Sequence, residues 1–304
     1  MTNANEIEKF ICDTYGRNGF VHYCNIAIES IKCGEAILSF EVEDDKHTNG
    51  AHSDMSILTF AMSSVVVSRA YYKLLELGAQ HTSNMSSLFH EVRQVGIKEE
   101  KNLLQVTKGV NTQRDILFAG GILAAAGGYL ARKPDAVVDD VFTIVVNMTK
   151  GLVKNELEHL DKKTKLTAGE LLYKKYGITG IRCEVEKGFP SVRNIGVPAL
   201  EKAFEQGISL NDAMVHGLIS LMTCVEDSNV IWRADYETLQ RVQLKAKDIL
   251  AKGSIFTSIG REEIQKFDND CVEHSISPGG AADLLSITIA LFLLKNAEFP
   301  TQIM

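Results

Sequence analysis

A serine–proline–glycine–glycine sequence near the carboxyl end has the composition of a phosphate-binding helix start. In residues 277–285 (SPGGAADLL), Ser277 and the proline after it are typical of an N-cap and a first helical position. Gly279 and Gly280 leave the first turn without side chains, so an anion can approach the exposed N–H groups and the positive end of the helix dipole. Asp283 follows in the same helix. These four residues are candidates for substrate or phosphate binding; a plain helix cap is the alternative.

A second stretch, residues 109–115 (GVNTQRD), precedes a segment rich in glycine and alanine. Asn111 or Thr112 can cap the helix expected there, which leaves Arg114 free to bind a phosphate through two parallel hydrogen bonds. The small residues that follow lower the helix propensity, so they indicate that neighbouring helices or a ligand approach the backbone closely. Asn111, Thr112 and Arg114 are therefore further candidates for substrate binding.

Two glutamates lie two positions apart in residues 182–190 (RCEVEKGFP), between two expected helices. In an extended segment Glu184 and Glu186 point the same way. Paired carboxylates can hold Mg²⁺, which also binds phosphate oxygens, or they can share acid and base roles. A solvated charged loop fits the spacing equally well. Arg182, at the start of the stretch, is a candidate phosphate ligand.

Acidic residues also follow the helix expected over residues 210–225, in the sequence EDSN. Negative charge at a helix C-terminus opposes the helix dipole, so a cation or Arg233 should compensate it. Asp227 is therefore a candidate metal ligand or acid–base group, and Asn229 and Arg233 are candidates for substrate binding. Trp232 is expected to pack in the core.

An imidazole and a carboxylate lie close together in residues 49–55 (NGAHSDM), just before an expected helix. Asp54 either caps that helix, or binds a metal or orients a substrate. His52 is either a surface residue or a substrate ligand. Both are kept as candidates, Asp54 for catalysis and His52 for binding.

The elements that must position these residues are mainly helical. Apolar residues recur at helical spacing from about residue 47 onward, and no linker interrupts the pattern. We therefore predict an all-α fold, with one compact multi-helix domain over residues 47–304. Helices are expected over residues 56–77, 112–131, 136–157, 167–176, 197–206, 210–225, 236–251 and 278–295.

Residues 1–46 have a different pattern. After a short helical stretch, two alternating apolar runs, residues 26–31 and 36–42, flank a turn that contains Gly34. Alternation, β-branched residues and a central glycine predict a β-hairpin. Residues 1–46 are therefore expected to form a separate N-terminal segment with a short helix and a hairpin.

Composition excludes several classes of function. The chain has 304 residues, a net charge of −7 and no Lys/Arg cluster, which argues against nucleic acid as a partner. Six cysteines without CxxC spacing indicate neither a zinc site nor a disulfide framework. The longest apolar run, residues 284–294, is too short to span a bilayer, and no secretory leader opens the sequence. We expect a reduced, cytoplasmic protein without a membrane segment.

The five stretches, in their order along the chain, resemble the CitG/MdcB family of triphosphoribosyl-dephospho-CoA synthases, which serve citrate and malonate decarboxylase systems. The resemblance covers about residues 49–294 and runs through NGAHSDM, GVNTQRD, LTAGELLYKKYGITGIRCEVEKGFPSV, EDSNVIWR and SPGGAADLL. It implies an all-α fold and a reaction between ATP and 3′-dephospho-CoA. Adenine leaves, and the ribose 5-triphosphate group is joined to the 2′-hydroxyl of dephospho-CoA. The product is the precursor of a carrier protein's prosthetic group, so a carrier-protein transferase is implied downstream.

This chemistry suits the candidate residues. Cleavage of an N-glycosidic bond builds positive charge on the sugar, which carboxylates stabilise, and both adenine and the hydroxyl must exchange a proton. A triphosphate needs Mg²⁺, arginines and helix N-termini. The expected phosphate ligands are Arg114, Arg182, Arg233 and the turn at residues 277–280. The expected groups for proton transfer are Asp54, Glu184, Glu186 and Asp227, of which Glu184, Glu186 and Asp227 are also the expected Mg²⁺ ligands.

The chain departs from the family pattern at several positions. Gln113, Arg114 and Asp115 stand where the family has histidine, lysine and glycine. Cys183 and Ala234 stand where it has glycine, and no proline-rich segment precedes NGAHSDM. A catalytically impaired relative that binds nucleotide or dephospho-CoA is therefore one alternative. A second is a hotdog-type acyl-CoA thioesterase, because residues 20–63 resemble the opening of that fold. The oligomeric state and the decarboxylase served are not set by the sequence.

Overall fold

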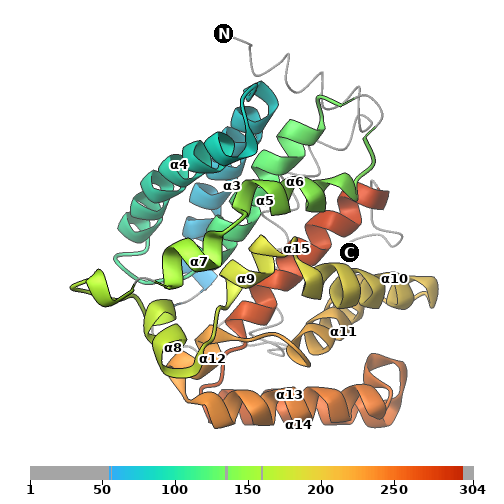
Figure 1. Cartoon of the computed structure of the whole chain (residues 1–304). Helices are drawn as coiled ribbons and strands as arrows, with labels where there is room; N and C mark the ends of the chain where they lie inside the picture. Colours follow the sequence, from blue (N-terminus) through green and yellow to red (C-terminus); the bar gives the residue numbers. More distant parts are fainter. Residues whose placement is uncertain (1–54, 56, 134–135, 159, 297–304) are drawn as a thin grey trace.

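A computed structural model describes residues 55, 57–133, 136–158 and 160–296 (Figure 1). These residues form helices joined by turns, and no strand occurs among them. The all-α prediction is therefore confirmed for the described part of the chain. The predicted hairpin, the boundary at residue 46, and the candidates His52 and Asp54 lie outside the described residues.

The described helices fall into three consecutive groups along the chain. The first group is α3 (Ile57–Gln80), α4 (Met85–Val106), α5 (Arg114–Leu130), α6 (Asp140–Thr149) and α7 (Leu152–Leu157). The second is η1 (Leu160–Lys162), α8 (Ala168–Tyr176), α9 (Ile181–Glu186), the π-helical η2 (Val192–Gly196), α10 (Val197–Glu205) and α11 (Leu210–Met222). The third is α12 (Ser228–Arg233), α13 (Tyr236–Ala251), η3 (Ser254–Phe256), α14 (Ser258–Glu273) and α15 (Gly279–Asn296).

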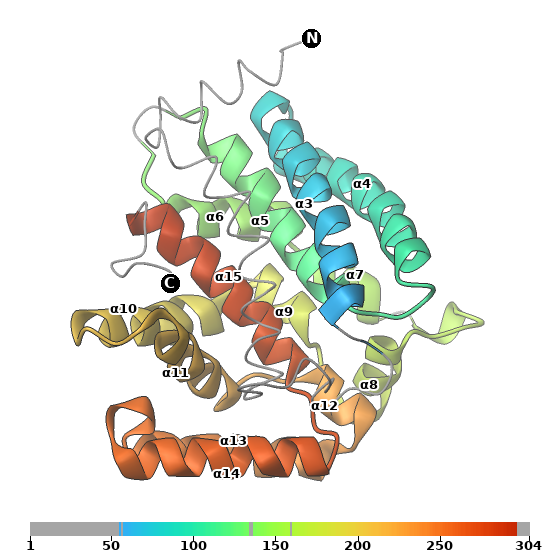
Figure 2. The same cartoon turned by 180° about the vertical axis from the view of Figure 1, so that it is seen from behind.

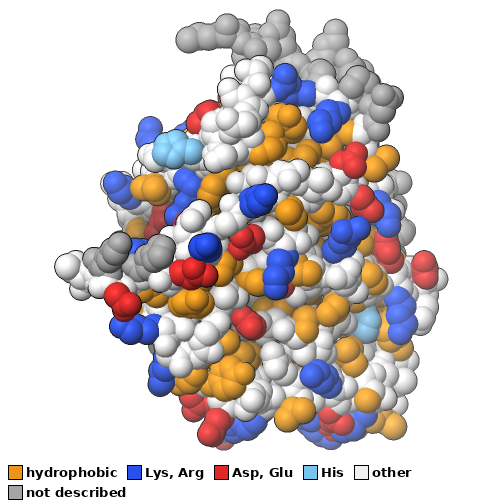
Figure 3. Space-filling model, viewed as in Figure 1, with side chains coloured by type: hydrophobic (Ala, Val, Ile, Leu, Met, Phe, Trp, Pro, Cys, Tyr) orange, Lys and Arg blue, Asp and Glu red, His pale blue; other side chains and the backbone are white. Residues whose placement is uncertain are grey.

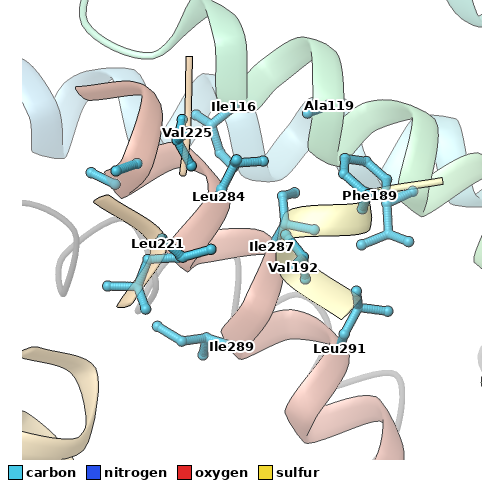
Figure 4. Packing of buried hydrophobic residues seen from close by; sticks show 14 of the residues in the cluster. Ile116, Ala119, Phe189, Val192, Leu221, Val225, Leu284, Ile287, Ile289 and Leu291 are labelled. Carbon is cyan, nitrogen blue, oxygen red and sulfur yellow. The ribbon is translucent and has the colours of Figure 1, made fainter. Parts of the chain in front are cut away.

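Helix α15 is the central element of the core. It runs through the middle of the molecule, with α5 on one side and α10 and α11 on the other (Figures 1 and 2). Leu284 and Ile287 of α15 pack with Ile116 of α5 and Leu221 of α11 (Figure 4). By length and hydropathy α15 would also be able to cross a membrane, but most of its side chains are buried inside this fold. Its apolar composition is therefore that of a core helix.

The glycine- and alanine-rich helix α5 packs against α3 at very short range. A Cβ added to Gly128 would lie 2.0 Å from the carbonyl oxygen of Leu75, and one added to Gly120 would lie 2.0 Å from the hydroxyl of Tyr71. That hydroxyl donates a hydrogen bond of 2.6 Å to the carbonyl of Ile116. Of the two explanations for the small residues, close approach of a neighbouring helix therefore accounts for these positions.

Several predicted elements differ from the observed ones. The single helix expected over residues 136–157 is divided into α6 and α7, because Gly151 lies between them in the left-handed region at φ +82°. Helices α4 and α14 were not predicted, since each buries only a narrow apolar stripe within a highly charged sequence. The extended segment expected at residues 182–190 is wrong in its first half, which forms α9.

A buried carboxylate joins α3 to α4. The side chain of Glu99 on α4 is fully buried, and its two oxygens accept hydrogen bonds from Arg69 Nη2 at 2.8 Å and Lys73 Nζ at 2.7 Å, both on α3. Asn102 Nδ2 donates a further bond of 2.9 Å. Burial alone would raise the pKa of Glu99, but these donors outweigh it and lower the pKa to about 2.

We predict that Glu99→Gln lowers the free energy of unfolding by about 2 kcal/mol at neutral pH, because two cations lose their buried partner. The folded-state pKa lies below the unfolded value of 4.5, so this contribution is complete above that pH and is lost as the pH falls toward about 2. Urea denaturation at neutral pH and at about pH 3 measures both effects. The difference between parent and variant should shrink in acid.

Glu273→Gln is the matched control, because Glu273 is exposed near the end of α14. Its stability should follow that of the parent at both pH values. A Glu99→Gln variant that loses the same stability in acid as at neutral pH would contradict the assignment.

Candidate active site

A pocket of about 230 Å³ lies where α4, α5, α8, α9 and α12 meet. Acidic and basic side chains are mixed on the surface around α7 and α9 on this face of the molecule (Figure 3). Six charged residues line the pocket: Arg93, Glu100, Arg114, Asp115, Glu156 and Arg182. The remaining walls include Asn111, the residues from Thr167 to Gly169, Ser228, Asn229 and Trp232.

Carboxylates hold the three arginines in place around the pocket. Glu156 on α7 receives Arg93 Nη2 at Oε1 and Arg182 Nε at Oε2, each at 2.7 Å. Arg114 at the start of α5 pairs with Glu100 on α4. A guanidinium has five N–H donors, so one carboxylate leaves donors for a further anion. The arrangement positions three cations before any ligand arrives.

Helix α8 begins at the same pocket. Thr167 caps it by accepting the N–H of Glu170, and the Glu170 carboxylate accepts the N–H of Thr167 in return. Gly169 in the first turn leaves room for a neighbour, because a Cβ there would lie 3.3 Å from Arg182 Nη1. The positive end of the α8 dipole and an arginine therefore face one space.

Two half-buried aspartates near the pocket affect one another. Burial raises the pKa of Asp115, while the guanidinium groups of Arg182 and Arg114 lower it. Burial, the charge of Asp115 and the charge of Asp227 all raise the pKa of Asp283 well above its usual range. The causes that set the pKa of Asp283 include no positively charged group, so the repulsion from Asp115 and Asp227 is not offset. The charges of Asp115 and Asp227 therefore make ionisation of Asp283 unfavourable in this fold.

Asp227 connects two helix starts. Its Oδ1 accepts the N–H groups of Asn229 and Val230 at the start of α12, and its Oδ2 accepts that of Ala281 at 2.9 Å in the first turn of α15. Burial raises the pKa of this carboxyl, whereas the backbone hydrogen bonds, including one from Gly280, lower it. Its oxygens are thus already engaged by backbone donors.

This arrangement changes the interpretation of the SPGG turn. A Cβ on Gly280 would lie 3.1 Å from Asp227 Oδ1, and a Cβ on Gly279 would lie 2.8 Å from Asn229 Nδ2. The two glycines therefore allow the side chains of Asp227 and Asn229 to approach the first turn of α15. The Asp227 carboxylate occupies the place expected for a phosphate. Ser277 is buried, and neither it nor the two glycines line the pocket.

The two glutamates of α9 do not form a pair. Glu186 accepts the N–H groups of Gly151 and Val153 at 2.6 and 3.0 Å, at the start of α7. Glu184 accepts the N–H of Ser191 at 3.2 Å and its hydroxyl at 2.5 Å, and burial raises the pKa of Glu184. The two side chains hold different segments because a helix turns neighbouring positions apart. Among the described residues no three His, Cys, Asp or Glu side chains are grouped as for a metal.

The other predicted site residues are divided between the pocket and its surroundings. Asn111, Arg114, Arg182 and Asn229 line the pocket, whereas Thr112 and Arg233 do not. Arg233 is exposed at the end of α12. The Thr112 hydroxyl is buried and has no hydrogen-bond partner among residues 57–133, 136–158 and 160–296.

Sequence reasoning missed several pocket residues. Arg93, Glu100 and Glu156 lie on helices without a motif, so only tertiary structure brings them to the site. The capping pair of Thr167 and Glu170 was a readable signal, because threonine followed three positions later by glutamate is typical of a helix start. Trp232, expected in the core, is 56% exposed on the pocket wall.

Comparisons with known proteins give a consistent family. Residues 45–300 match the model of the family described as CitG: ATP:dephospho-CoA triphosphoribosyl transferase. A probable 2-(5''-triphosphoribosyl)-3'-dephosphocoenzyme-A synthase of Malonomonas rubra is 43% identical over 84% of this chain and 82% of its own length. The synthase of that name from Pectobacterium atrosepticum is 35% identical, over 85% of this chain and 82% of its own length. No solved structure matches the chain.

We predict that Asp227→Ala lowers the free energy of unfolding by about 2–4 kcal/mol, because buried N–H groups at two helix starts lose their acceptor. Asp235→Ala is the matched control, since Asp235 caps only the exposed start of α13 through the N–H of Thr238. Denaturant unfolding of both variants measures the difference. Equal losses would show that the link between α12 and α15 adds nothing beyond an ordinary cap.

Proposed function

The chain belongs to the family of ATP:dephospho-CoA triphosphoribosyl transferases, and we propose that its reaction takes place in the pocket between α4, α5, α8, α9 and α12. The enzyme is a transferase of the triphosphoribosyl-dephospho-CoA synthase type, with ATP and dephospho-CoA as substrates. The main support for this location of the reaction is that Arg93, Arg114 and Arg182 all line one pocket, which also contains the start of α8. Three cations and a helix start suit a triphosphate.

The bond changes require few groups from the protein. The C1′–N9 bond of ATP breaks, a bond forms between C1′ and the 2′-oxygen of dephospho-CoA, and the proton lost by that hydroxyl balances the one adenine gains. Positive charge builds on the ribose as the bond breaks, so a nearby carboxylate lowers the barrier. Among the described acids on the pocket wall, Glu100 and Glu156 are paired with arginines. Asp115 is the acid that we assign to this role.

We propose that Asp115 and Asp283 hold a divalent cation. Mg²⁺ is commonly held by one or two carboxylates together with substrate phosphates, so a group of three protein ligands is not needed. The mutual repulsion of the two aspartates is the feature that a cation would relieve. When bound, Mg²⁺ would neutralise part of the triphosphate charge. We propose this pair as its ligands in preference to Glu184, Glu186 and Asp227, whose oxygens accept hydrogen bonds from other parts of the chain.

Two departures from the family pattern, Arg114 in place of lysine and Asp115 in place of glycine, lie on the pocket wall, and the arginine keeps the positive charge. The other substituted positions lie away from it. Gln113 is buried and donates a hydrogen bond of 3.4 Å to Ser64 Oγ on α3, and its Oε1 has no partner within the described part of the chain. Cys183 and Ala234 do not line the pocket either. We therefore propose that the chain is active. Neither an impaired relative nor a hotdog-type thioesterase is supported by the comparisons.

Two finer expectations rest on the family alone. We propose that the enzyme acts in the cytoplasm, where ATP and dephospho-CoA are available. We also propose that a carrier-protein transferase uses its product, because the product is a prosthetic-group precursor.

The direct test is mass spectrometry of the protein incubated with ATP, 3′-dephospho-CoA and Mg²⁺. Free adenine and the triphosphoribosyl adduct should appear in equal amounts. Adenine without adduct would indicate hydrolysis of ATP in place of transfer. Binding of both nucleotides without either product would overturn the proposal that the chain is active.

We predict that Arg182→Lys lowers kcat/KM for ATP by about 10- to 100-fold, because an ammonium cannot hold Glu156 and a phosphate in the same planar geometry. Arg261→Lys is the matched control, since Arg261 pairs with exposed Asp212 on another part of the surface. Steady-state kinetics with both variants checks the location of the site. A normal kcat/KM for Arg182→Lys would remove this pocket as the ATP site.

We predict that Asp283→Asn raises the melting temperature by roughly 2–4 °C without Mg²⁺, because it removes one of two repelling charges. Since the folded-state pKa of Asp283 is raised, its carboxylate costs stability at neutral pH, and this cost disappears as the pH falls. Mg²⁺ should stabilise the parent but not the variant. Calorimetric scans with and without Mg²⁺ measure both effects, with Asp139→Asn, an exposed position, as control. Equal stabilisation of parent and Asp283→Asn by Mg²⁺ would contradict the proposed ligand pair.

A further inference from the structure

Trp232 is an exposed aromatic residue on the wall of the pocket. Its side chain is 56% exposed, and it is the single tryptophan of the chain. No hydrogen bond or ring contact of the indole occurs within the described part of the chain. Tryptophan is enriched at binding interfaces, because its side chain combines a large apolar ring with one polar N–H group.

The direction of this indole is fixed by α12. Ser228, Asn229 and Trp232 are spaced along one face of the helix, and all three line the pocket. Val230 and Ile231, on the opposite face, are 1% and 3% exposed in the core. Rotation of α12 that buried the tryptophan would expose these two side chains. The core therefore holds the indole at the pocket.

The rest of the pocket is mostly charged or polar. Its other aromatic residue is Phe118, whose ring lies under the guanidinium of Arg93 at 5.5 Å. Exposed hydrophobic side chains lie over α8 and α12 on this face (Figure 3). Leu171 and Trp232 are among the exposed apolar residues of those two helices. Trp232 is thus the more exposed of the two aromatic residues on a pocket wall that also carries the three arginines.

We propose that Trp232 binds an adenine ring by stacking and so acts as a binding residue for the base of a nucleotide substrate. This inference rests on the proposed function, since both substrates, ATP and 3′-dephospho-CoA, carry adenine. Stacking on an aromatic side chain requires only the flat ring of the base. The phosphate groups of the same nucleotide can then bind the arginines. Trp232 would then bind the base of a nucleotide, and the arginines would bind its phosphates.

Fluorescence of the single tryptophan tests the contact directly. Each ligand is added alone, so no transfer can occur, and excitation is set where adenine does not absorb. We expect adenosine, and ATP or dephospho-CoA or both, to quench the emission with saturation. Inorganic tripolyphosphate and 4′-phosphopantetheine, which lack the base, should leave it nearly unchanged. Equal quenching by tripolyphosphate, or none by any adenine compound, would overturn the inference.

Substitutions show which substrate supplies the ring. Trp232→Leu should raise the KM of that substrate by about 5- to 100-fold, with a smaller change for the other substrate, whereas Trp232→Phe should stay close to the parent. The side chain is more than half exposed, so both variants should fold, which far-UV circular dichroism confirms. Unchanged KM values for both substrates in folded Trp232→Leu would reject the proposed role.

The two proposals fail in different ways. Quenching by adenosine without formation of adduct would keep the adenine site and reject the transferase activity at this pocket. Adduct formation with no quenching and with normal kinetics for Trp232→Leu would keep the transferase and reject stacking on Trp232.

Discussion

The carboxylate of Asp227 is the constraint on which the site depends. It accepts N–H groups from the first turns of α12 and α15, so the starts of the two helices are held together by one side chain. Helix α15 is the centre of the core, and α12 carries Asn229 and Trp232 to the pocket. Through this contact the central core helix positions one wall of the site. Gly279 and Gly280 permit it, because a Cβ at either position would meet Asn229 or Asp227. A buried carboxylate in this position resembles a built-in anion at two helix N-termini.

The opposite wall is positioned by a second set of close contacts. Helix α5 packs directly against α3 through its glycines, where no Cβ would fit. Glu99 links α4 to α3 through ion pairs with Arg69 and Lys73. These two attachments place Arg93 and Glu100 of α4 opposite Arg114 and Asp115 of α5. Glu186 adds a third attachment, since it holds the start of α7, the helix that carries Glu156. Glu186, a catalytic candidate in the sequence, thus helps to position an element of the pocket wall.

Pairing of charges within the pocket explains how it can be both polar and stable. Glu156 holds two arginines and Glu100 a third, which avoids the cost of unpaired cations before substrate binds. A triphosphate would add negative charge to the same guanidinium groups, which have donors to spare. Asp283 differs, because the charges of Asp115 and Asp227 raise its pKa and no cation is among the causes that set it. Such unrelieved charge at a functional site costs stability and is compatible with a ligand that removes the cost.

The sequence by itself determined the helical class, most helix positions and the family, because these depend on local periodicity, caps and short motifs. It also identified Asn111, Arg114, Arg182 and Asn229 at the pocket. It did not determine the partners of charged residues. In the sequence, Asp227 and the SPGG turn look like separate binding elements. In the tertiary structure, the Asp227 carboxylate lies against Gly280 and accepts an N–H group from the first turn of α15. Glu184 and Glu186 looked paired because an extended backbone was assumed, whereas α9 sends them to Ser191 and to the start of α7. Arg93, Glu156 and Trp232 reach the site only through packing of distant helices. Local sequence patterns determine the secondary structure of a segment, whereas long-range packing determines which donor each charged side chain binds.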